Sequence, residues 1–148
     1  MTWEKEIKEL KKREKLAEKM GGPEKLKRQK DNNRLNIRER IDLLLDKDSF
    51  HEIGKISGKA TYDEKGELVN FTPANFVFGR GKINKKEVVV GGDDFTVRGG
   101  AADASIHQKQ VMAEQLANEY RLPIIRLIEG TGGGGSVKSL DTDARTYI

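Results

Sequence analysis

Apolar positions divide the chain into a helix-rich first third and a strand-rich remainder. Up to about residue 48, apolar residues recur at helical spacing and predict helices at residues 3–20, 24–30 and 35–45. Gly21-Gly22-Pro23 is expected to end the first helix, and Asn32 or Asn33 to cap the third. The apolar side of the third helix comprises Leu35, Ile37, Ile41, Leu43, Leu44 and Leu45.

The second part alternates strands with one helix. Residues 50–56 begin the strand region, and residues 58–70 are expected to be a mobile connection that turns at 63–66. Residues 74–83 and 87–93 predict a hairpin joined at 84–86, and Val88-Val89-Val90 predicts a strand buried on both faces. A helix at 104–120 and a buried strand at 122–128 follow, so the order indicates an α/β fold. The residues expected to face the sheet from this helix are Ile106, Val111, Met112, Gln115 and Leu116.

Composition narrows the class of protein. A chain of 148 residues is long enough for one domain with a core. It has no cysteine, which is typical of a reducing compartment, and no apolar run of the roughly 20 residues that a membrane span needs. The charged N-terminus lacks the apolar segment of a signal peptide. These features predict a cytoplasmic protein that does not enter a membrane.

Charge is unevenly distributed along the chain. Residues 1–40 carry a net charge of +6, whereas residues 41–148 carry −2. The pairs Glu4/Lys8 and Glu9/Arg13 are spaced as i,i+4 ion pairs, which favours a solvated helix over a nucleic-acid-binding arm, since no aromatic residues are interleaved for base stacking. A third interpretation is that a basic face assists the capture of a phosphate-rich ligand.

Two glycine-rich loops dominate the remaining sequence. The first is Arg98-Gly99-Gly100-Ala101, and the second runs from Gly130 to Gly135. A predicted helix and an apolar strand separate them, so two stretches of backbone N–H groups free of side chains are expected at neighbouring points. Backbone N–H pairs of this kind stabilise oxyanions in acyl chemistry.

Two nucleotide-binding motifs are matched only in part. Residues 54–60 are one residue too short for a phosphate-binding loop, and Ala60 stands where Ser or Thr must hold magnesium. Gly130-x-Gly132-x-x-Gly135 matches the dinucleotide fingerprint, but a glycine run satisfies many such patterns.

The sequence contains few residues that are candidates for acid–base catalysis or metal binding. The two histidines have no cysteine to support them, so no metal site is predicted. Asp93 and Asp94 are adjacent on a strand and should point to opposite faces. No base is evident for Ser105 or Ser136. The histidines are His51 and His107, and His107 is expected to be a surface or packing residue rather than a base.

These same segments resemble a known family. Residues 21–54, the stretch VFGRGKINKKEVVVGGDDFTVRGGAADASIHQKQ and the stretch RLPIIRLIEGTGGGG are similar to the carboxyltransferase (β) subunits of acyl-CoA carboxylases, of the propionyl-CoA and methylcrotonyl-CoA type. The resemblance covers residues 21–139. It implies an α/β fold of the ClpP/crotonase type, a spiral of ββα units that is incomplete here and preceded by N-terminal helices. It also implies a helical segment at 1–48 and the first part of a carboxyltransferase N-terminal domain at 49–148.

The resemblance also implies the chemistry. Family members move a carboxyl group from carboxybiotin to the α-carbon of an acyl-CoA. The biotin is carried by a biotin carboxyl carrier or biotin carboxylase subunit, and the carboxyltransferase is a homo-oligomer. Arg98, Gly99, Gly100 and Ala101 then correspond to the CoA-binding loop, and Gly132 and Gly133 to the catalytic oxyanion pair. No metal is implied in this chain.

The sequence departs from the family in two respects. Residues 129–134 replace the usual acid-Ser-Gly-Gly-Ala pattern. The alignment of the oxyanion pair with the family can therefore shift by one residue. Family members are longer and supply the biotin side of the site from a second domain, so this chain alone is expected to be inactive. Three alternatives remain: a biotin-dependent acyl-CoA decarboxylase subunit, a non-catalytic CoA-binding or assembly fragment, and a dinucleotide-binding domain.

Overall fold

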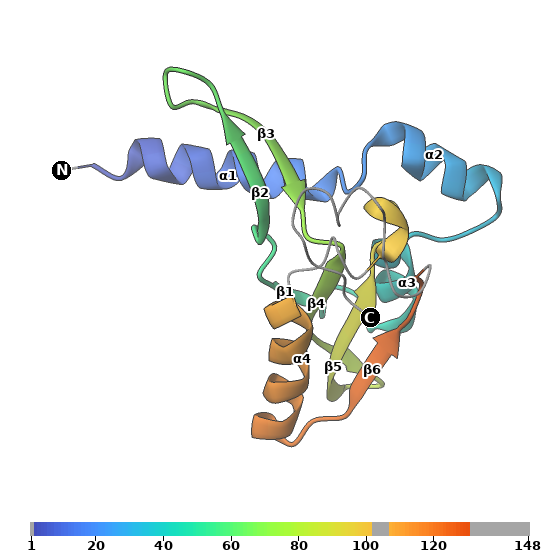
Figure 1. The fold of residues 1–148 in the computed structure, drawn as a ribbon. Coiled ribbons are helices and arrows are strands. Elements are labelled where there is room, and N and C mark those ends of the chain that lie inside the picture. The colour runs from blue at the N-terminus through green and yellow to red at the C-terminus, as the bar shows by residue number, and fades with distance from the viewer. Residues whose placement is uncertain (1, 102–106, 131–148) are drawn as a thin grey trace.

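The computed structural model describes residues 2–101 and 107–130 (Figure 1). All three N-terminal helices, the hairpin and the later helix and strand are present near their predicted positions. The elements in these ranges are α1 (Glu4–Glu18), α2 (Pro23–Asp31), α3 (Ile37–Leu44), β1 (His51–Ile53), β2 (Gly58–Tyr62), β3 (Leu68–Pro73), β4 (Phe76–Ile83), β5 (Lys86–Asp93), the short 3-10 turn η1 (Arg98–Gly100), α4 (His107–Tyr120) and β6 (Ile124–Leu127).

The main sheet places the ends of two parallel strands side by side. Among the described residues its strand order is β1-β4-β5-β6. β4 and β5 form the predicted antiparallel hairpin, and Asn84 and Lys85 at its turn both have positive φ, 50° and 67°, as a tight two-residue hairpin requires. α4 then crosses over so that β6 pairs with β5 in parallel. The loops that follow β5 and β6 therefore leave the same edge of the sheet.

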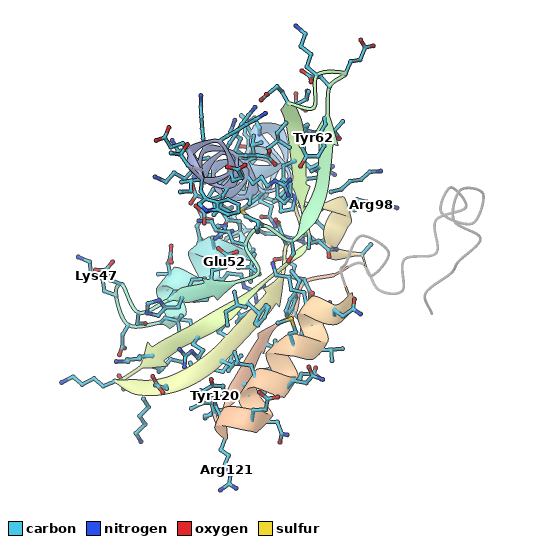
Figure 2. The ribbon with its side chains drawn as sticks, turned by 90° about the vertical axis from the view of Figure 1, so that its left-hand side faces the viewer. Lys47, Glu52, Tyr62, Arg98, Tyr120 and Arg121 are labelled. Atoms are coloured by element: carbon cyan, nitrogen blue, oxygen red, sulfur yellow. The ribbon has the colours of Figure 1, made fainter. Side chains whose placement is uncertain are left out.

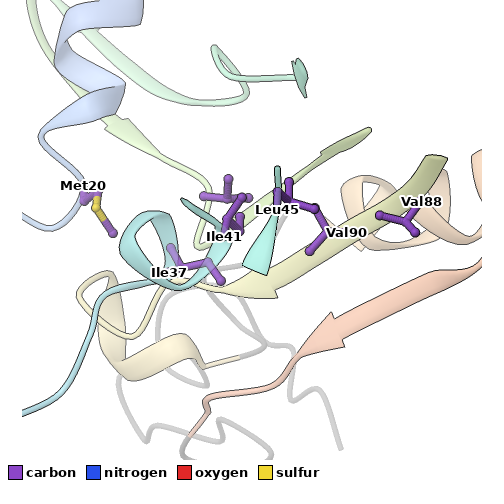
Figure 3. Close-up of a cluster of buried hydrophobic side chains, with 7 residues drawn as sticks. Met20, Ile37, Ile41, Leu45, Val88 and Val90 are labelled. Atoms are coloured by element: carbon purple, nitrogen blue, oxygen red, sulfur yellow. The ribbon is translucent and has the colours of Figure 1, made fainter. Parts of the chain in front are cut away.

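Helices cover both faces of this sheet. Figure 2 shows α3 and α4 on opposite sides of it. Val88 and Val90 pack with Ile37 and Ile41 of α3 (Figure 3), whereas Val89 points to the other face and packs with α4. The three valines are almost fully buried, which confirms the prediction of a strand that is apolar on both faces.

The cap of α3 differs from the prediction. Asn36, and not Asn32 or Asn33, begins the helix, and its Oδ1 accepts hydrogen bonds from the backbone N–H groups of Arg38 and Glu39. The Glu39 carboxylate accepts the Asn36 N–H in return at 2.9 Å, which completes a capping box. The predicted apolar side was also too wide, because Leu43 is 74% exposed and Leu35 is 46% exposed.

The expected mobile connection at residues 58–70 is wrong. Strands β2 and β3 form an antiparallel hairpin there, with the turn near 63–66 as predicted. Leu68 and Phe71 are buried, and Lys12 of α1 donates a hydrogen bond to the Leu68 carbonyl. The hairpin is ordered because α1 covers it, a long-range contact that the local sequence pattern does not reveal (Figure 1).

Two further burial predictions are wrong. In α4, Ala113 and Ala117 are buried against the sheet, while Met112 is 50% exposed and Gln115 is also exposed. Small side chains face the sheet because the rings of Phe76 and Phe78 already fill the space between the layers. β6 is the outer strand of the sheet in the described ranges, so its residues are partly exposed and not fully buried. Ile106 lies outside the described residues.

Candidate functional site

The two glycine-rich loops meet at the edge of the sheet where β5 and β6 end. The first loop follows β5, and Glu129 and Gly130 follow β6. The loops are so close that a Cβ on Gly100 would lie 2.3 Å from the Glu129 carbonyl oxygen. The predicted proximity is therefore confirmed for the start of the second loop. Gly132 and Gly133 lie outside the described residues.

The first loop is a tight left-handed turn. Arg98, Gly99 and Gly100 have φ values of 51°, 64° and 69°, a conformation that glycine adopts at little cost. The Gly100 N–H donates to the Val97 carbonyl at 3.1 Å, and the Ala101 N–H donates to the Arg98 carbonyl at 3.2 Å. These two N–H groups therefore form hydrogen bonds within the turn itself.

A buried network beneath the loop fixes its position. Asp94 is 1% exposed and accepts hydrogen bonds from the Thr96 N–H at 2.9 Å and the Thr96 hydroxyl at 2.5 Å. Burial raises the pKa of the Asp94 carboxyl, and the Thr96 hydrogen bonds offset part of that effect. The Asn75 amide donates to the Ala101 carbonyl at 2.7 Å and so holds the other end of the loop.

Asp93 and Asp94 have different hydrogen-bond partners, and Asp93 is the last residue of β5. It accepts the Glu129 backbone N–H at 3.2 Å and so links the end of β5 to the start of the second loop. The Glu129 carboxylate accepts hydrogen bonds from Arg40 and from Gln29, each at 3.4 Å. Residues of α2 and α3 therefore anchor the second loop beside the first.

A basic pocket of about 520 Å³ opens beside the first loop. It brings cationic side chains of α2 and of the α2–α3 connection next to the residues that follow β5, and Arg98 extends from η1 (Figure 2). The Arg34 guanidinium lies 5.9 Å from the centre of the Phe95 ring, a cation–π contact. The pocket is lined by Lys25, Arg28, Gln29, Asn32, Arg34, Phe95, Thr96, Arg98 and Gly99.

The sequence analysis did not assign Lys25, Arg28 or Arg34 to the site. The signal that pointed to them was the positive charge of residues 1–40, with its interpretation as a face that captures phosphate. The structure places these three residues of that segment beside the first loop. Their distance in sequence from residues 98–101 hid the connection.

A partly buried charge cluster lies at the start of α4. Lys109 is 4% exposed, and burial lowers its pKa to about 8, opposed by the negative charge of Glu52 and aided by the positive charge of Arg38. Arg38 and Glu52 form a two-pronged ion pair with N–O distances of 2.8 and 3.0 Å. These residues come from α4, α3 and β1, so no local motif predicted the cluster.

The other candidates of the sequence analysis contribute little to this site. His51 is exposed, and His107 lies at the first position of α4. Ser105 and Ser136 fall outside the described residues. Within residues 2–101 and 107–130, no group of three or more His, Asp or Glu side chains is arranged to hold a metal ion. None of the helices in those ranges has the length and apolar content to cross a lipid bilayer.

Comparison with solved structures identifies the class of fold. A crystal structure of transcarboxylase 12S with methylmalonyl-coenzyme A and methylmalonic acid bound aligns with 97% of this chain and 28% of its own, at a TM-score of 0.75 and 26% identity. The β subunit of geranyl-CoA carboxylase from P. aeruginosa aligns with 80% of the chain at a TM-score of 0.60, a likeness of fold. The protein therefore has the crotonase-like α/β fold of carboxyltransferases, as predicted.

Sequence comparison identifies the family. Residues 28–145 match the carboxyl transferase domain, so the chain belongs to that family. It is 37% identical over 113 residues to a probable mitochondrial methylcrotonoyl-CoA carboxylase β chain of Drosophila melanogaster, covering 76% of this chain and 19% of the relative. It is 35% identical over 134 residues to a putative propionyl-CoA carboxylase β chain of Bacillus subtilis, covering 90% of this chain and 26% of the relative. The chain thus spans about a fifth to a quarter of these relatives.

Proposed function

We propose that this chain forms part of a biotin-dependent acyl-CoA carboxyltransferase, which moves a carboxyl group from carboxybiotin to the α-carbon of an acyl-CoA. The observation that supports this function best is the contact between the two glycine loops beside a basic pocket. An acyl-CoA has the matching shape: a phosphate-rich nucleotide at one end, and at the other a thioester whose oxygen becomes negative in the reaction.

The pocket suggests how the nucleotide end is held. Lys25, Arg28 and Arg34 provide cationic groups for phosphates, and the Phe95 ring offers a flat surface for a purine. The pantetheine arm then runs past Gly99 and Gly100, where the absence of side chains permits close approach to the backbone.

The second loop is the proposed site of charge stabilisation. The backbone N–H groups of Gly132 and Gly133 stabilise the enolate oxygen of the thioester. Biotin on a carrier subunit supplies the carboxyl group and the base that accepts the α-proton, which accounts for the few acid–base groups in this chain. Asp93 and Glu129 act as positioning residues, since they join the second loop to the sheet and to the helices.

The proposed partners follow from this chemistry. They are a biotin carboxyl carrier or biotin carboxylase subunit and further copies of the same chain; the transcarboxylase 12S structure is described as a hexamer assembly. Neither nucleic acid nor a membrane is a proposed partner, and the cytoplasm is the proposed location. A decarboxylase subunit and a non-catalytic CoA-binding fragment are the alternatives that share the same loops.

Calorimetric titration with CoA, 3′,5′-ADP and NAD tests the binding part of the proposal. CoA and 3′,5′-ADP should bind and compete with each other, and NAD should not displace them. Arg28→Gln should raise the Kd for CoA about tenfold, because it removes a charge-assisted contact to phosphate worth about 1–2 kcal/mol. Lys47→Gln is the control, because Lys47 is exposed and far from the pocket (Figure 2). Binding of NAD in place of CoA would favour the dinucleotide-binding alternative.

Carboxyl transfer is a separate measurement. Labelled malonyl-CoA and free biocytin are incubated with the chain, alone and with the remaining part of a full-length relative. Transfer of label to biocytin supports a carboxyltransferase. CoA binding without transfer in either mixture identifies a non-catalytic CoA-binding fragment.

A further inference from the structure

Helix α1 extends from the body of the molecule (Figure 1). It carries a line of exposed apolar side chains. Trp3 is 67% exposed, Ile7 is 48% exposed and Leu10 is 42% exposed. Their spacing of four and then three residues places them along one side of the helix, as in the seam of a coiled coil. An apolar line of this kind on a surface helix is typical of a contact with another helix.

A row of lysines runs beside the apolar line. At 100° per residue, Lys8, Lys11, Lys15 and Lys19 fall within about 80° of the helix circumference. They border a shallow groove of about 780 Å³ together with Glu4, Ile7, Lys12 and Leu16. In the described part of the chain, no carboxylate lies within 4 Å of these four ammonium groups.

The opposite side of α1 is already occupied. Glu9 accepts a hydrogen bond from the Tyr62 hydroxyl at 3.0 Å and pairs with Arg13 at 2.7 Å. Glu18 lies between Ile7 and Lys11 around the helix, and its carboxylate is already paired with Lys55 at 2.6 Å. The β2–β3 hairpin therefore holds the helix in place and uses the charges on its inner side. The apolar line and the lysine row remain as a preformed outer surface.

We propose that this outer surface docks an acidic amphipathic helix of a partner protein. The apolar residues of the partner pack on Trp3, Ile7 and Leu10, and its carboxylates face the lysine row. Charge complementarity selects this occupant, since electrostatic attraction steers association and fixes the register of the helices. The docking surface is separate from the glycine loops, so it does not depend on the function proposed above.

Other occupants fit this surface less well. Glu14 occupies the next seam position after Leu10, and Glu6 lies at its border, so an anionic membrane or a nucleic acid would meet carboxylates next to the lysines. A second copy of the same surface would bring two lysine rows together. An acidic helix with basic or polar residues opposite Glu4 and Glu14 avoids both conflicts.

Trp3 is the only tryptophan of the chain, so its fluorescence reports on this surface directly. The probe is a synthetic 21-residue helical peptide with leucine at the seam positions, except for one glutamine that faces Glu14, and with glutamate beside the seam. A second peptide has lysine in place of glutamate. The acidic peptide should shift Trp3 emission to the blue, with a Kd that rises about tenfold from low to high salt because screening weakens the pairing. The lysine peptide should leave the emission unchanged.

Matched variants complete the test. Lys11→Glu/Lys15→Glu should weaken binding of the acidic peptide at least about tenfold, whereas Lys47→Glu/Lys86→Glu, the same change of charge away from α1, should not. All four side chains are solvent-accessible, and circular dichroism checks that both variants fold. The proposal is overturned if the two peptides bind equally or not at all. It is also overturned if phosphatidylglycerol vesicles bind more tightly than the acidic peptide, or if sedimentation shows that this surface pairs with itself.

Discussion

At the scale of single residues, Gly100 shows how strongly the site constrains side-chain size. Its φ of 69° favours glycine, and its Cα faces the Glu129 carbonyl so closely that a methyl group would lie 2.3 Å from the oxygen. Both constraints act at the contact between the two loops. Gly100 therefore limits how closely the first loop approaches the start of the second loop.

Gly100→Ala is expected to reduce both stability and CoA affinity. The left-handed conformation alone costs alanine about 1–2 kcal/mol, and the contact with Glu129 adds to that cost by pushing the loops apart. Gly66→Ala is the control: its φ is 76°, but nothing lies within 4 Å of the added methyl group. Urea unfolding should show a larger loss for Gly100→Ala than for Gly66→Ala, and only Gly100→Ala should weaken CoA binding. Equal losses and unchanged CoA affinity would contradict a role for the loop contact.

Site residues that lie close together in the sequence could be predicted, whereas those that are far apart in the sequence could not. The proximity of the two glycine loops could be predicted, because each loop follows an apolar strand in the sequence. Lys25, Arg28 and Arg34 could not be assigned, because the pocket exists only after α2 folds back beside residues 95–99. The hydrogen bonds within the first loop were also invisible, since backbone pairing depends on the turn geometry that the fold imposes.

At the scale of elements, α3 begins at a capping residue that was predicted wrongly from the sequence. Asn32 or Asn33 was predicted to cap the N-terminus of this helix. However, α2 continues to Asp31, and Asn32 follows it as the C-terminal cap. Asn33 has a φ of 56° and belongs to the turn between the helices. Asn36 was the better choice, because Glu39 three residues later completes a capping box.

Asn36→Ala should lower the free energy of unfolding by about 1 kcal/mol, within a range of about 0.5–2 kcal/mol for lost caps. The variant leaves the N–H groups of Arg38 and Glu39 without their acceptor. Asn36→Asp keeps an oxygen in that place and should be nearly neutral. Urea denaturation of the three proteins measures the difference, and an alanine variant as stable as the aspartate variant would show that the cap contributes nothing.

Burial on element surfaces was the least predictable part of the fold. The valines of β5 were assigned correctly because an apolar run in a central strand has only one interpretation. The β2–β3 hairpin was missed because its order comes from α1, some 50 residues earlier in the chain. In α4 the prediction favoured large apolar residues, whereas the tight approach to the sheet requires Ala113 and Ala117.

At the scale of the whole molecule, the cluster of Arg38, Glu52 and Lys109 joins the two layers of helices to the sheet edge. Arg38 and Glu52 neutralise each other's charge in an ion pair. The Arg38 Nε atom has no hydrogen-bond partner in the described structure. Lys109 adds a third charge beside this partly exposed pair, and its own side chain is buried. An unbalanced buried charge destabilises the fold, and the penalty disappears when the group loses its proton.

Lys109 should therefore make global stability depend on pH. Its pKa of about 8 in the folded state lies below the ordinary value of 10.5, so between these values the unfolded chain binds a proton that the folded chain has released. Stability should rise with pH across that window and be unaffected by this group below it. At about 1.4 kcal/mol per pKa unit, wild type should gain on the order of 2–3 kcal/mol relative to Lys109→Met between pH 7 and 10.5. Urea denaturation across this range measures the gain. Lys86→Met, the same change at an exposed site, should follow wild type, and parallel curves for wild type and Lys109→Met would show that Lys109 is not a buried ammonium at neutral pH.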